Sequence, residues 1–544
     1  MKILDCTLRD GGYYNDWNFD SNLIEEYFLA MARSGIEMIE VGFKNYPEAG
    51  FKGASYYCTE EYLTSINIPA NISIGVMLEA SSILNSKKDV KPSVRELFVE
   101  SKDSKIDFVR IACHFNSVEK TKEIAFELAA LGYKVFVNLM QVSLKTNSEI
   151  ANVLKSIDSW GLVSCMYFAD SLGNMNDKQT TDMVSIFKKN WKGEIGVHMH
   201  NNKGLALSNT MAALNADVEY VDVTVSGMGR GAGNAEAELL IAELKGMSDS
   251  KYDLYPVAKL AIEHFHPMKL DMKWGPSLHY FLAAKYNIHP TYIQRILTDS
   301  HYGLSEHIGI IKYLHKLSNQ SNFQEEVLSN IFSSDVKHKA GVVDQYTTLS
   351  SIEVKASNGA IILGSGQSIS KYLDSSYSFI RKSGATVFSV NNAHSSLVDS
   401  VDYSLYLHNA KQMGHDFHFQ LGQSKAIIPV SRFSDAELSG INKNSIINFP
   451  VEVNFGELES SINGCTIPFD LTAAYAISAV KEMGYQKVYL IGFDGYDYMD
   501  SRQREMSELF FLAREKWPKM TITSLTPTTY PIEQGSLYAP IFRV

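Results

Sequence analysis

Short apolar runs alternate with longer amphipathic stretches from residue 1 to about 225. The runs have the length of β-strands, and the stretches between them have helical periodicity. Eight strands are expected at Ile3–Thr7, Met38–Phe43, Ile72–Met77, Phe108–Ala112, Val135–Gln141, Cys165–Ala169, Ile195–His200 and Tyr220–Val225. Strands that alternate with helices form parallel β-α-β units, and eight of them predict a closed (β/α)₈ TIM barrel. A doubly wound open sheet would show the same local pattern.

Polar residues stand at the carboxyl ends of several predicted strands, and this favours the barrel. They are Arg9, Asp10, Glu40, His114, Asp170, Ser171, His198 and His200. The active sites of TIM barrels are built from the carboxyl ends of the strands. The fold class expected for the first half of the chain is therefore α/β, with a site at one end of the barrel.

The pattern changes twice after the barrel. Helices are expected at Leu278–Tyr286, Pro290–Thr298 and Glu306–Leu317. Alternation then returns, with strands at Ala360–Leu363, Thr386–Val390 and Lys487–Gly492 and a helix at Leu471–Met483. We predict three domains: a barrel over residues 1–250, a helical accessory domain over 251–349 and a Rossmann-like α/β domain over 350–544.

Composition narrows the possible function classes. Of 544 residues, 45% are hydrophobic and 20% are charged, which is ordinary for a globular protein. The formal net charge of −11 gives no support to nucleic-acid or membrane-surface binding. Five scattered cysteines without a C-x-x-C pair favour a reducing cytoplasm. We also expect neither an export signal nor a membrane span.

The run GVHMHNN at 196–202 contains the H-x-H pair His198 and His200. Side chains at i and i+2 of a strand project from the same face, so two imidazoles would point to one place. Two hydrogen-bonded core histidines are the alternative. Asp10 at another strand end adds a carboxylate, and Asn234 can add a further oxygen unless it is simply a turn residue. Mn²⁺, Zn²⁺, Fe²⁺ and Mg²⁺ all accept such a nitrogen and oxygen set.

Two further features lie near this candidate metal site. Arg9 precedes Asp10 and could stabilise negative charge on an oxygen, although a surface salt bridge is the more common fate of an arginine. The segment Ser226–Asn234 follows the last predicted strand and contains four glycines. Barrels often bind anions on the backbone N–H groups of such a loop, while a merely flexible loop is the alternative.

Three motifs together resemble a known superfamily. They are LDCTLRDG at 4–11, GVHMHNNKGL at 196–205 and GMGRGAGNAEAE at 227–238. They resemble the metal-dependent lyases and condensing enzymes of the TIM-barrel type, which include hydroxymethylglutaryl-CoA lyase, isopropylmalate synthase and 4-hydroxy-2-oxovalerate aldolase. RIACH at 110–114 and ADS at 169–171 look most like the aldolase branch. The resemblance covers about the first half of the chain.

The resemblance implies a class II aldolase that makes or cleaves a 4-hydroxy-2-oxo acid through a pyruvate enolate. It also implies a divalent metal held by Asp10, His198 and His200, with Asn234 in support. Mn²⁺ is the metal we expect, with Mg²⁺, Zn²⁺ and Fe²⁺ as alternatives. Arg9 would neutralise the enolate oxygen, and Ser171 would orient the pyruvate. A homo-oligomer and an aldehyde dehydrogenase partner that takes the aldehyde are further expectations.

One position departs from the aldolase pattern. The aldolases carry a histidine three residues after the motif aspartate as candidate acid/base, and this chain has Tyr13 there. Tyrosine, with an ordinary pKa of about 10, is a poor base at neutral pH unless its surroundings lower that value. The alternatives for the acid/base are Tyr13 with a lowered pKa, His114 and a metal-bound water. A substrate that differs from that of the aldolases is the other explanation.

The C-terminal part contains GSGQS at 364–368 directly after a predicted strand. It could be a phosphate-binding turn or only a tight strand-to-helix turn. With the segments at 389–392 and 489–494, this part looks similar to Rossmann-like sialyltransferase domains. That resemblance implies a nucleotide-sugar held by Gly364, Gly366 and Ser368, and it connects the chain to surface-glycan or keto-sugar synthesis.

The sequence thus leaves three hypotheses. The first is a metal-dependent pyruvate-type aldolase acting on a small 2-oxo acid and an aldehyde. The second is an acyl-CoA-dependent Claisen-type lyase or synthase on the same metal site. The third, of another class, makes the barrel a scaffold for a nucleotide-sugar-binding module or glycosyltransferase.

Overall fold

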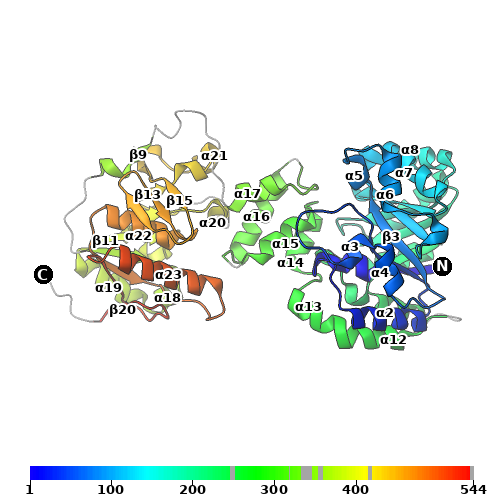
Figure 1. Ribbon diagram of the computed structural model, residues 1–544. Helices are drawn as coiled ribbons and strands as arrows, with labels where there is room; N and C mark the ends of the chain where they lie inside the picture. The colour runs from blue at the N-terminus through cyan, green and yellow to red at the C-terminus, as the bar shows by residue number, and fades with distance from the viewer. Residues whose placement is uncertain are drawn as a thin grey trace. The chain divides into compact units, whose positions relative to one another are not determined.

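The computed structural model describes residues 1–245, 251–299, 301–317, 319–332, 346–352, 359–413 and 419–538. The chain divides into two compact units (Figure 1). The first contains Met1–Gln294 and Leu317–Phe323, and the second contains Arg295–Lys316 and Gln324–Val544. The segment expected as a helical accessory domain therefore contributes to both units. Its predicted boundary at residue 250 lies outside the described residues.

Eight parallel strands close into a barrel in the first unit, and β8 pairs with β1 to complete it. The strands are β1 (Lys2–Asp5), β2 (Met38–Phe43), β3 (Ser73–Glu79), β4 (Phe108–Cys113), β5 (Lys134–Leu139), β6 (Val163–Asp170), β7 (Glu194–Met199) and β8 (Tyr220–Val223). The closed barrel is confirmed, and the open sheet is not. Every predicted strand is present, with ends displaced by at most two residues.

Helices connect the barrel strands. In chain order they are α1 (Thr7–Asp10), α2 (Ser21–Ser34), α3 (Ala54–Tyr57), α4 (Glu60–Ser65), α5 (Ala80–Leu84), α6 (Val90–Leu97), α7 (Val118–Ala130), α8 (Asn147–Trp160), α9 (Asp177–Asn190), α10 (Ala206–Asn215) and α11 (Ala237–Lys245). Local sequence sets their ends: α8 begins with a capping box between Thr146 and Glu149 and ends at Gly161, whose φ is +67°. Glycine adopts that left-handed conformation without steric cost.

The barrel interior is apolar at one level and charged at the next. Phe108 and Phe136 stack with ring centroids 4.9 Å apart, and Tyr167 stacks on Phe136 at 6.1 Å. The guanidinium of Arg110 lies 4.6 Å from the Tyr167 ring centroid and is fully buried. The aromatic layer fills the barrel and supports a layer of charged side chains near the carboxyl ends of the strands.

Further helices follow the barrel in the chain. They are α12 (Leu254–Leu260), α13 (His266–Met272), α14 (Leu278–Lys285), α15 (Pro290–Thr298), α16 (Leu304–Lys316) and α17 (Glu325–Phe332). Their positions agree with the helices expected from the sequence. In the first unit, Trp274 Nε1 donates to Ser226 O at 3.0 Å, so this segment contacts the loop after β8.

The second unit is built on a nine-stranded sheet whose strand pairs are all parallel. The order is β20 (Glu533–Gln534), β19 (Thr521–Ser524), β18 (Lys487–Ile491), β10 (Ala360–Leu363), β11 (Thr386–Val390), β12 (Tyr403–Leu405), β13 (Lys425–Ile428), β14 (Ile446–Asn448) and β9 (Thr347–Thr348). The expected α/β architecture of this part is confirmed. Its resemblance to sialyltransferases stays a prediction.

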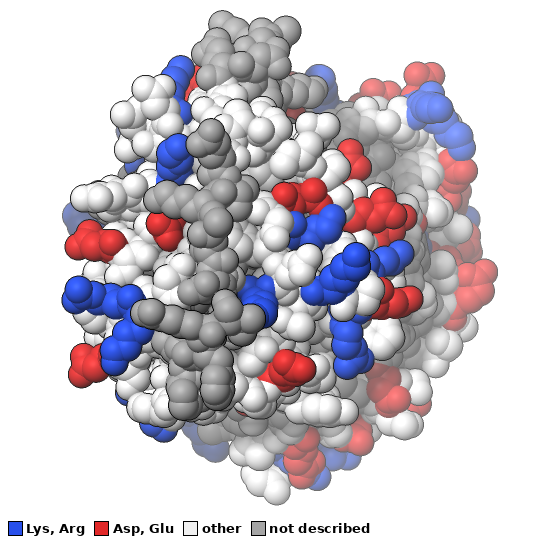
Figure 2. Space-filling model, turned by 90° about the vertical axis from the view of Figure 1, so that its left-hand side faces the viewer, with Lys and Arg blue, Asp and Glu red and all other residues white. Residues whose placement is uncertain are grey.

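Smaller elements complete the second unit. A three-stranded sheet has the order β15 (Val451–Val453), β17 (Gly464–Ile467) and β16 (Glu459–Ser461). The helices are α18 (Ser368–Lys371), α19 (Leu373–Ser383), α20 (Asn409–Met413), α21 (Asp435–Leu438), α22 (Thr472–Glu482) and α23 (Ser501–Lys516). On the face drawn in Figure 2, Lys and Arg side chains are interspersed with Asp and Glu.

Within the described ranges, no helix combines the length and the apolar character needed to cross a membrane.

Candidate active site at the barrel mouth

Asp10, His198 and His200 come together at the carboxyl ends of the barrel strands. Asp10 ends α1, directly after β1, while His198 lies in β7 and His200 just beyond it. Their potential ligand atoms all lie within 4.8 Å of one another, and all three residues are buried. His198 Nε2 is 3.8 Å from Asp10 Oδ2. The structure therefore juxtaposes the three side chains that the sequence suggested as metal ligands.

The protonation states of this group suit metal ligation. Burial would raise the pKa of Asp10, but Arg9 and the two histidines hold it below its usual range. Burial lowers the pKa of His200 to about 3. At neutral pH the aspartate is therefore ionised and His200 is neutral, which are the forms that bind a cation.

Asn234 belongs to the same cluster. Its Nδ2 donates to Asp10 Oδ2 at 2.5 Å, and its backbone forms a bridge with His200. Its Oδ1 is buried and has no hydrogen-bond partner among the described residues. A Cβ on Gly229 would lie 2.2 Å from Asn234 Nδ2, so glycine there permits the close approach. The glycine-rich loop thus serves to seat Asn234 against Asp10.

Arg9 is held between two carboxylates. Its Nε donates to Glu40 Oε2 at 2.7 Å, and its Nη1 donates to Asp10 Oδ1 at 2.6 Å. Only 5% of the residue is exposed. Its Nη2 is buried without a partner in the described part of the chain. A buried donor of this kind is costly unless a ligand completes it, which is typical of a binding site.

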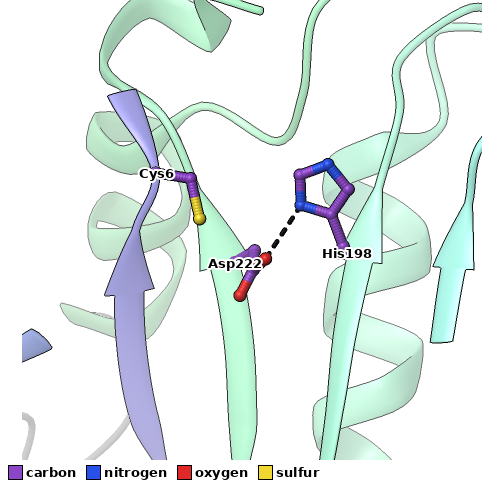
Figure 3. A group of neighbouring side chains, drawn as sticks. All are labelled: Cys6, His198 and Asp222. Carbon is purple, nitrogen blue, oxygen red and sulfur yellow. Dashed lines mark hydrogen bonds and ion pairs between the residues drawn. The ribbon is translucent and has the colours of Figure 1, made fainter. Parts of the chain in front are cut away.

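A charged network beneath the site fixes His198. Figure 3 shows His198 Nδ1 bonded to Asp222 Oδ2 at 2.8 Å, with Cys6 nearby. The carboxylate on Nδ1 orients the ring so that Nε2 faces Asp10. Asp222 also accepts from Arg110 Nη1 at 2.5 Å.

Cys6, His198 and Asp222 form a second group whose atoms could reach one cation. Arg110 occupies that position instead, because its Nη2 contacts Cys6 Sγ at 3.3 Å and its Nη1 bonds Asp222. A buried guanidinium repels a second cation at such distances. The group at Asp10, His198 and His200 is therefore the better candidate metal centre.

Comparison with known proteins identifies a family match in the first half of the chain. The HMGL-like family model matches residues 1–262. Residues 1–262 form an HMGL-like domain.

Relatives of the HMGL-like domain are aldolases by name. The 4-hydroxy-2-oxovalerate aldolase of Geobacillus genomosp. 3 is 28% identical over 267 residues, which are 48% of this chain and 75% of that protein. The aldolase of the same name from Carboxydothermus hydrogenoformans is 28% identical, covering 49% and 77%. The solved N-terminal domain of a candidate aldolase from Bacteroides vulgatus is 29% identical, with a TM-score of 0.50, covering 55% of this chain and 98% of that one. The family and these relatives group the chain with carbon–carbon lyases.

Two candidate acid/base residues lie at the mouth of the HMGL-like domain. Desolvation raises the pKa of Tyr13 to about 12, although Arg230 opposes the rise from 5.6 Å above the ring. Tyr13 is therefore protonated at neutral pH, and the lowered pKa considered for it is absent. Desolvation, with Arg230, lowers the pKa of His114 below its usual range. His114 is thus neutral near pH 7 and able to accept a proton.

Ser171 follows β6 and faces the loop after β5. Its Oγ accepts from the Gln141 N–H at 3.0 Å, which leaves the hydroxyl hydrogen for another acceptor. The neighbouring Asp170 accepts from the N–H groups of Asn174 and Met175, both at 3.0 Å. Asp170 therefore stabilises the loop after β6, while the Ser171 hydroxyl keeps its hydrogen available for a ligand.

Sequence reasoning missed several residues of this region. Asp222 was hidden inside a predicted strand, although its charge in an apolar run was a usable signal. Arg230, Glu79 and His289 interact electrostatically with residues at the barrel mouth. His289 lies at the start of α15, outside the barrel, and no local motif marks it.

Gly364, Gly366 and Ser368 lie in the second unit. The two glycines line a cavity of about 630 Å³. The Ser368 N–H donates to Asp494 Oδ2 at 2.8 Å, and the Ser368 hydroxyl also bonds that carboxylate. The donors of Ser368 in the GSGQS turn are thus directed to a carboxylate of the protein itself, which supports the reading of a tight strand-to-helix turn at Ser368.

Proposed function

We propose that the HMGL-like domain is a divalent-metal-dependent class II aldolase that makes or cleaves a 4-hydroxy-2-oxo acid, with pyruvate as the common part. The observation that carries this proposal is the convergence of Asp10, His198 and His200 beside the unpartnered Nη2 of Arg9. The names of the relatives support the same substrate class.

The donor set fits a divalent cation. One carboxylate and two imidazoles, with the unpartnered Oδ1 of Asn234 beside them, form a nitrogen and oxygen set without thiolate. Mn²⁺ is the proposed metal, with Mg²⁺, Zn²⁺ and Fe²⁺ as alternatives. When bound, such an ion supplies Lewis acidity to the 2-oxo acid.

The protein's own side chains would supply the rest of the chemistry. Arg9 Nη2 is available to donate to the oxygen that becomes negative as the carbon–carbon bond breaks. The Ser171 hydroxyl is available to hold the substrate carboxylate. His114, being neutral, can accept the proton of the 4-hydroxyl group, and the protonated Tyr13 can serve only as a donor.

Deuterium exchange into the pyruvate methyl group tests this proposal. With Mn²⁺ added, the protein should exchange the methyl protons, and chelation or Asp10→Asn should abolish the exchange. A protein that contains its metal and does not exchange would favour the rival Claisen-type reaction on an acyl-CoA.

A second candidate function concerns the second unit, for which we propose nucleotide-sugar binding. Chain order reverses at β10, which has β11 on one side and β18 on the other. Ligands of doubly wound sheets bind at the carboxyl ends of strands at such a reversal. The 630 Å³ cavity lies there, lined by residues that include Gly364, Asn391 and Gly492. Titration of the full chain with nucleotide-sugars by calorimetry tests this, and no binding would remove both this role and the glycosyltransferase hypothesis.

Four further properties of the protein are predictions. They are a homo-oligomer, an aldehyde dehydrogenase partner, a cytoplasmic location and a role in surface-glycan or keto-sugar synthesis. Sedimentation of the purified protein would test the first of these directly.

A further inference from the structure

A cavity of about 480 Å³ lies beside the carboxyl ends of β2 and β3 in the first unit. It is lined by ten residues, and all but Pro47 are hydroxyl-bearing, amide or charged. Glu79 is the last residue of β3, and Ser81 and Ser82 follow it in α5. The barrel geometry thus puts a polar cavity at the same end of the barrel as the candidate metal centre.

Glu79 lines this cavity and also interacts electrostatically with residues of the candidate active site. Its carboxylate interacts with the charges of Arg9 and Arg230, and it also acts on Tyr13. Its backbone N–H donates to Asn45 Oδ1 at 3.4 Å, which fixes the strand end. Glu79 is therefore within electrostatic reach of Arg9 and Tyr13 at this end of the barrel.

Several polar groups of the cavity are available to a ligand. Among the described residues, the Ser82 hydroxyl makes only a long contact, 3.5 Å, with the Tyr46 N–H. In the described part of the chain, neither the Asn85 amide nor the Lys87 ammonium group has a side-chain hydrogen bond or an ion pair, whereas Lys88 is paired with Glu96 at 2.6 Å. The wall accordingly presents donors and acceptors, not an apolar surface.

We propose that this cavity receives the aldehyde part of the substrate, and that the aldehyde is a polyhydroxylated, sugar-type one. The inference rests on the aldolase function proposed above. Hydroxyl groups along a carbon chain can bond Glu79, Ser82 and Asn85 in turn. A short alkyl aldehyde would make none of these bonds, and a site built to bond hydroxyl groups rejects analogues that lack them by large factors.

The ammonium group of Lys87 at the cavity wall could contact a phosphate on the sugar. An unpaired ammonium group at the cavity wall would bind either a phosphate or a hydroxyl group. A comparison of erythrose with erythrose 4-phosphate distinguishes binding of a hydroxyl group from binding of a phosphate. If the substrate carries a phosphate, kcat/KM for erythrose 4-phosphate should exceed that for erythrose at least about 10-fold, and Lys87→Gln should remove this advantage. If the substrate is a neutral sugar, the two values should be similar, and Lys87→Gln should not change their ratio.

The test compares aldehydes in condensation with pyruvate, using full-length protein and Mn²⁺. We expect kcat/KM for erythrose or its phosphate to exceed that for acetaldehyde by at least about 100-fold. Asn85→Ala and Ser82→Ala should each reduce this preference about 5- to 10-fold. Lys91→Ala, on α6 but outside the cavity, is the control and should leave the preference unchanged.

The result that would overturn the inference is distinct from failure of the aldolase function. Wild-type protein that exchanges pyruvate protons but prefers acetaldehyde would overturn the sugar-type substrate and keep the aldolase. A preference for erythrose that survives both Asn85→Ala and Ser82→Ala would overturn the placement in this cavity. Absence of pyruvate exchange would remove the aldolase function itself, and the inference with it.

Discussion

The candidate ligand site at the barrel mouth differs from the ionic cluster around His301 in the cavity of the second unit. At the barrel mouth, Arg9 Nη2 and Asn234 Oδ1 are buried and lack partners among the residues described. In the second unit, His301 bonds Asp299 through Nδ1 at 2.7 Å and Glu505 through Nε2 at 2.9 Å. The first site keeps buried atoms that a ligand must satisfy, whereas these charges of the second unit satisfy one another.

Two histidines express the same difference. Burial lowers the pKa of His200 to about 3, so this imidazole stays neutral. Hydrogen bonds to Asp299 and Glu505 raise the pKa of His301 to about 9, so this one stays charged. Identical side chains thus serve a candidate ligand set in one region and an ionic cross-link in the other, and only their neighbours decide which.

The largest effect is expected from Arg110→Met. The substitution leaves the carboxylates of Glu40 and Asp222 buried without this counter-ion, and breaking a buried pair costs about 3–5 kcal/mol. Chemical denaturation of the metal-free protein should show the loss. Arg95→Met removes a partly exposed partner of Glu127 and should cost less than about 1 kcal/mol. If the two variants lost equal free energy of unfolding, the buried pairs of Arg110 would be no more important for stability than the partly exposed pair of Arg95.

Arg9→Met should lower the rate of the reaction, and it should also destabilise the fold because Arg9, like Arg110, is a buried partner of Glu40. The substitution removes the unpartnered Nη2 donor, and loss of one donor to a developing oxyanion typically lowers rates about 10²- to 10³-fold. The rate of pyruvate methyl exchange with Mn²⁺ measures this. Arg9→Lys keeps a charge beside Asp10 without the guanidinium fork and should recover only part of the rate. Exchange within about 3-fold of wild type in Arg9→Met would exclude the proposed role.

The sequence was sufficient for the barrel and for the residues at its strand ends. Strand periodicity fixed β2 (Met38–Phe43) to the residue, and the H-x-H spacing put His198 and His200 on one face. These inferences depend on local geometry, which short-range patterns carry well.

What the sequence could not supply depends on long-range packing. Arg110 and Asp222 are 112 positions apart in the chain, and their pairing follows only from barrel closure. The hydrogen bond from the Ser368 N–H to Asp494 likewise joins the segments after β10 and β18, which are neighbours only in the folded sheet. The pKa of Tyr13 was also beyond reach, because it depends on the desolvation that the folded barrel mouth imposes.

The cross-link at His301 predicts a moderate dependence of stability on pH. Because the folded-state pKa, about 9, lies above the ordinary value near 6.5, its contribution is fully present below pH 6.5 and is lost as pH rises through 9. A third of the side chain is exposed, so solvent screening limits the effect to roughly 1 kcal/mol. Thermal unfolding between pH 6 and 10 should show the decline, and His301→Gln should flatten it. His264→Gln, at an exposed pair with Glu26 in the first unit, should leave the decline in place.

The smallest effect is expected from Tyr13→Phe. Since the pKa of Tyr13 is raised to about 12, the phenol does not ionise below pH 9 and cannot act as the base. The alkaline part of the pH profile for pyruvate exchange should therefore be the same in Tyr13→Phe and in wild type, with a rate change of at most about 3-fold. His114→Gln, in contrast, should reduce cleavage of the 4-hydroxy-2-oxo acid about 10²-fold, because it removes the neutral imidazole proposed as base. If Tyr13→Phe alone shifted the profile, the proton acceptor at the barrel mouth would be the tyrosine, and the assignment of His114 would be wrong.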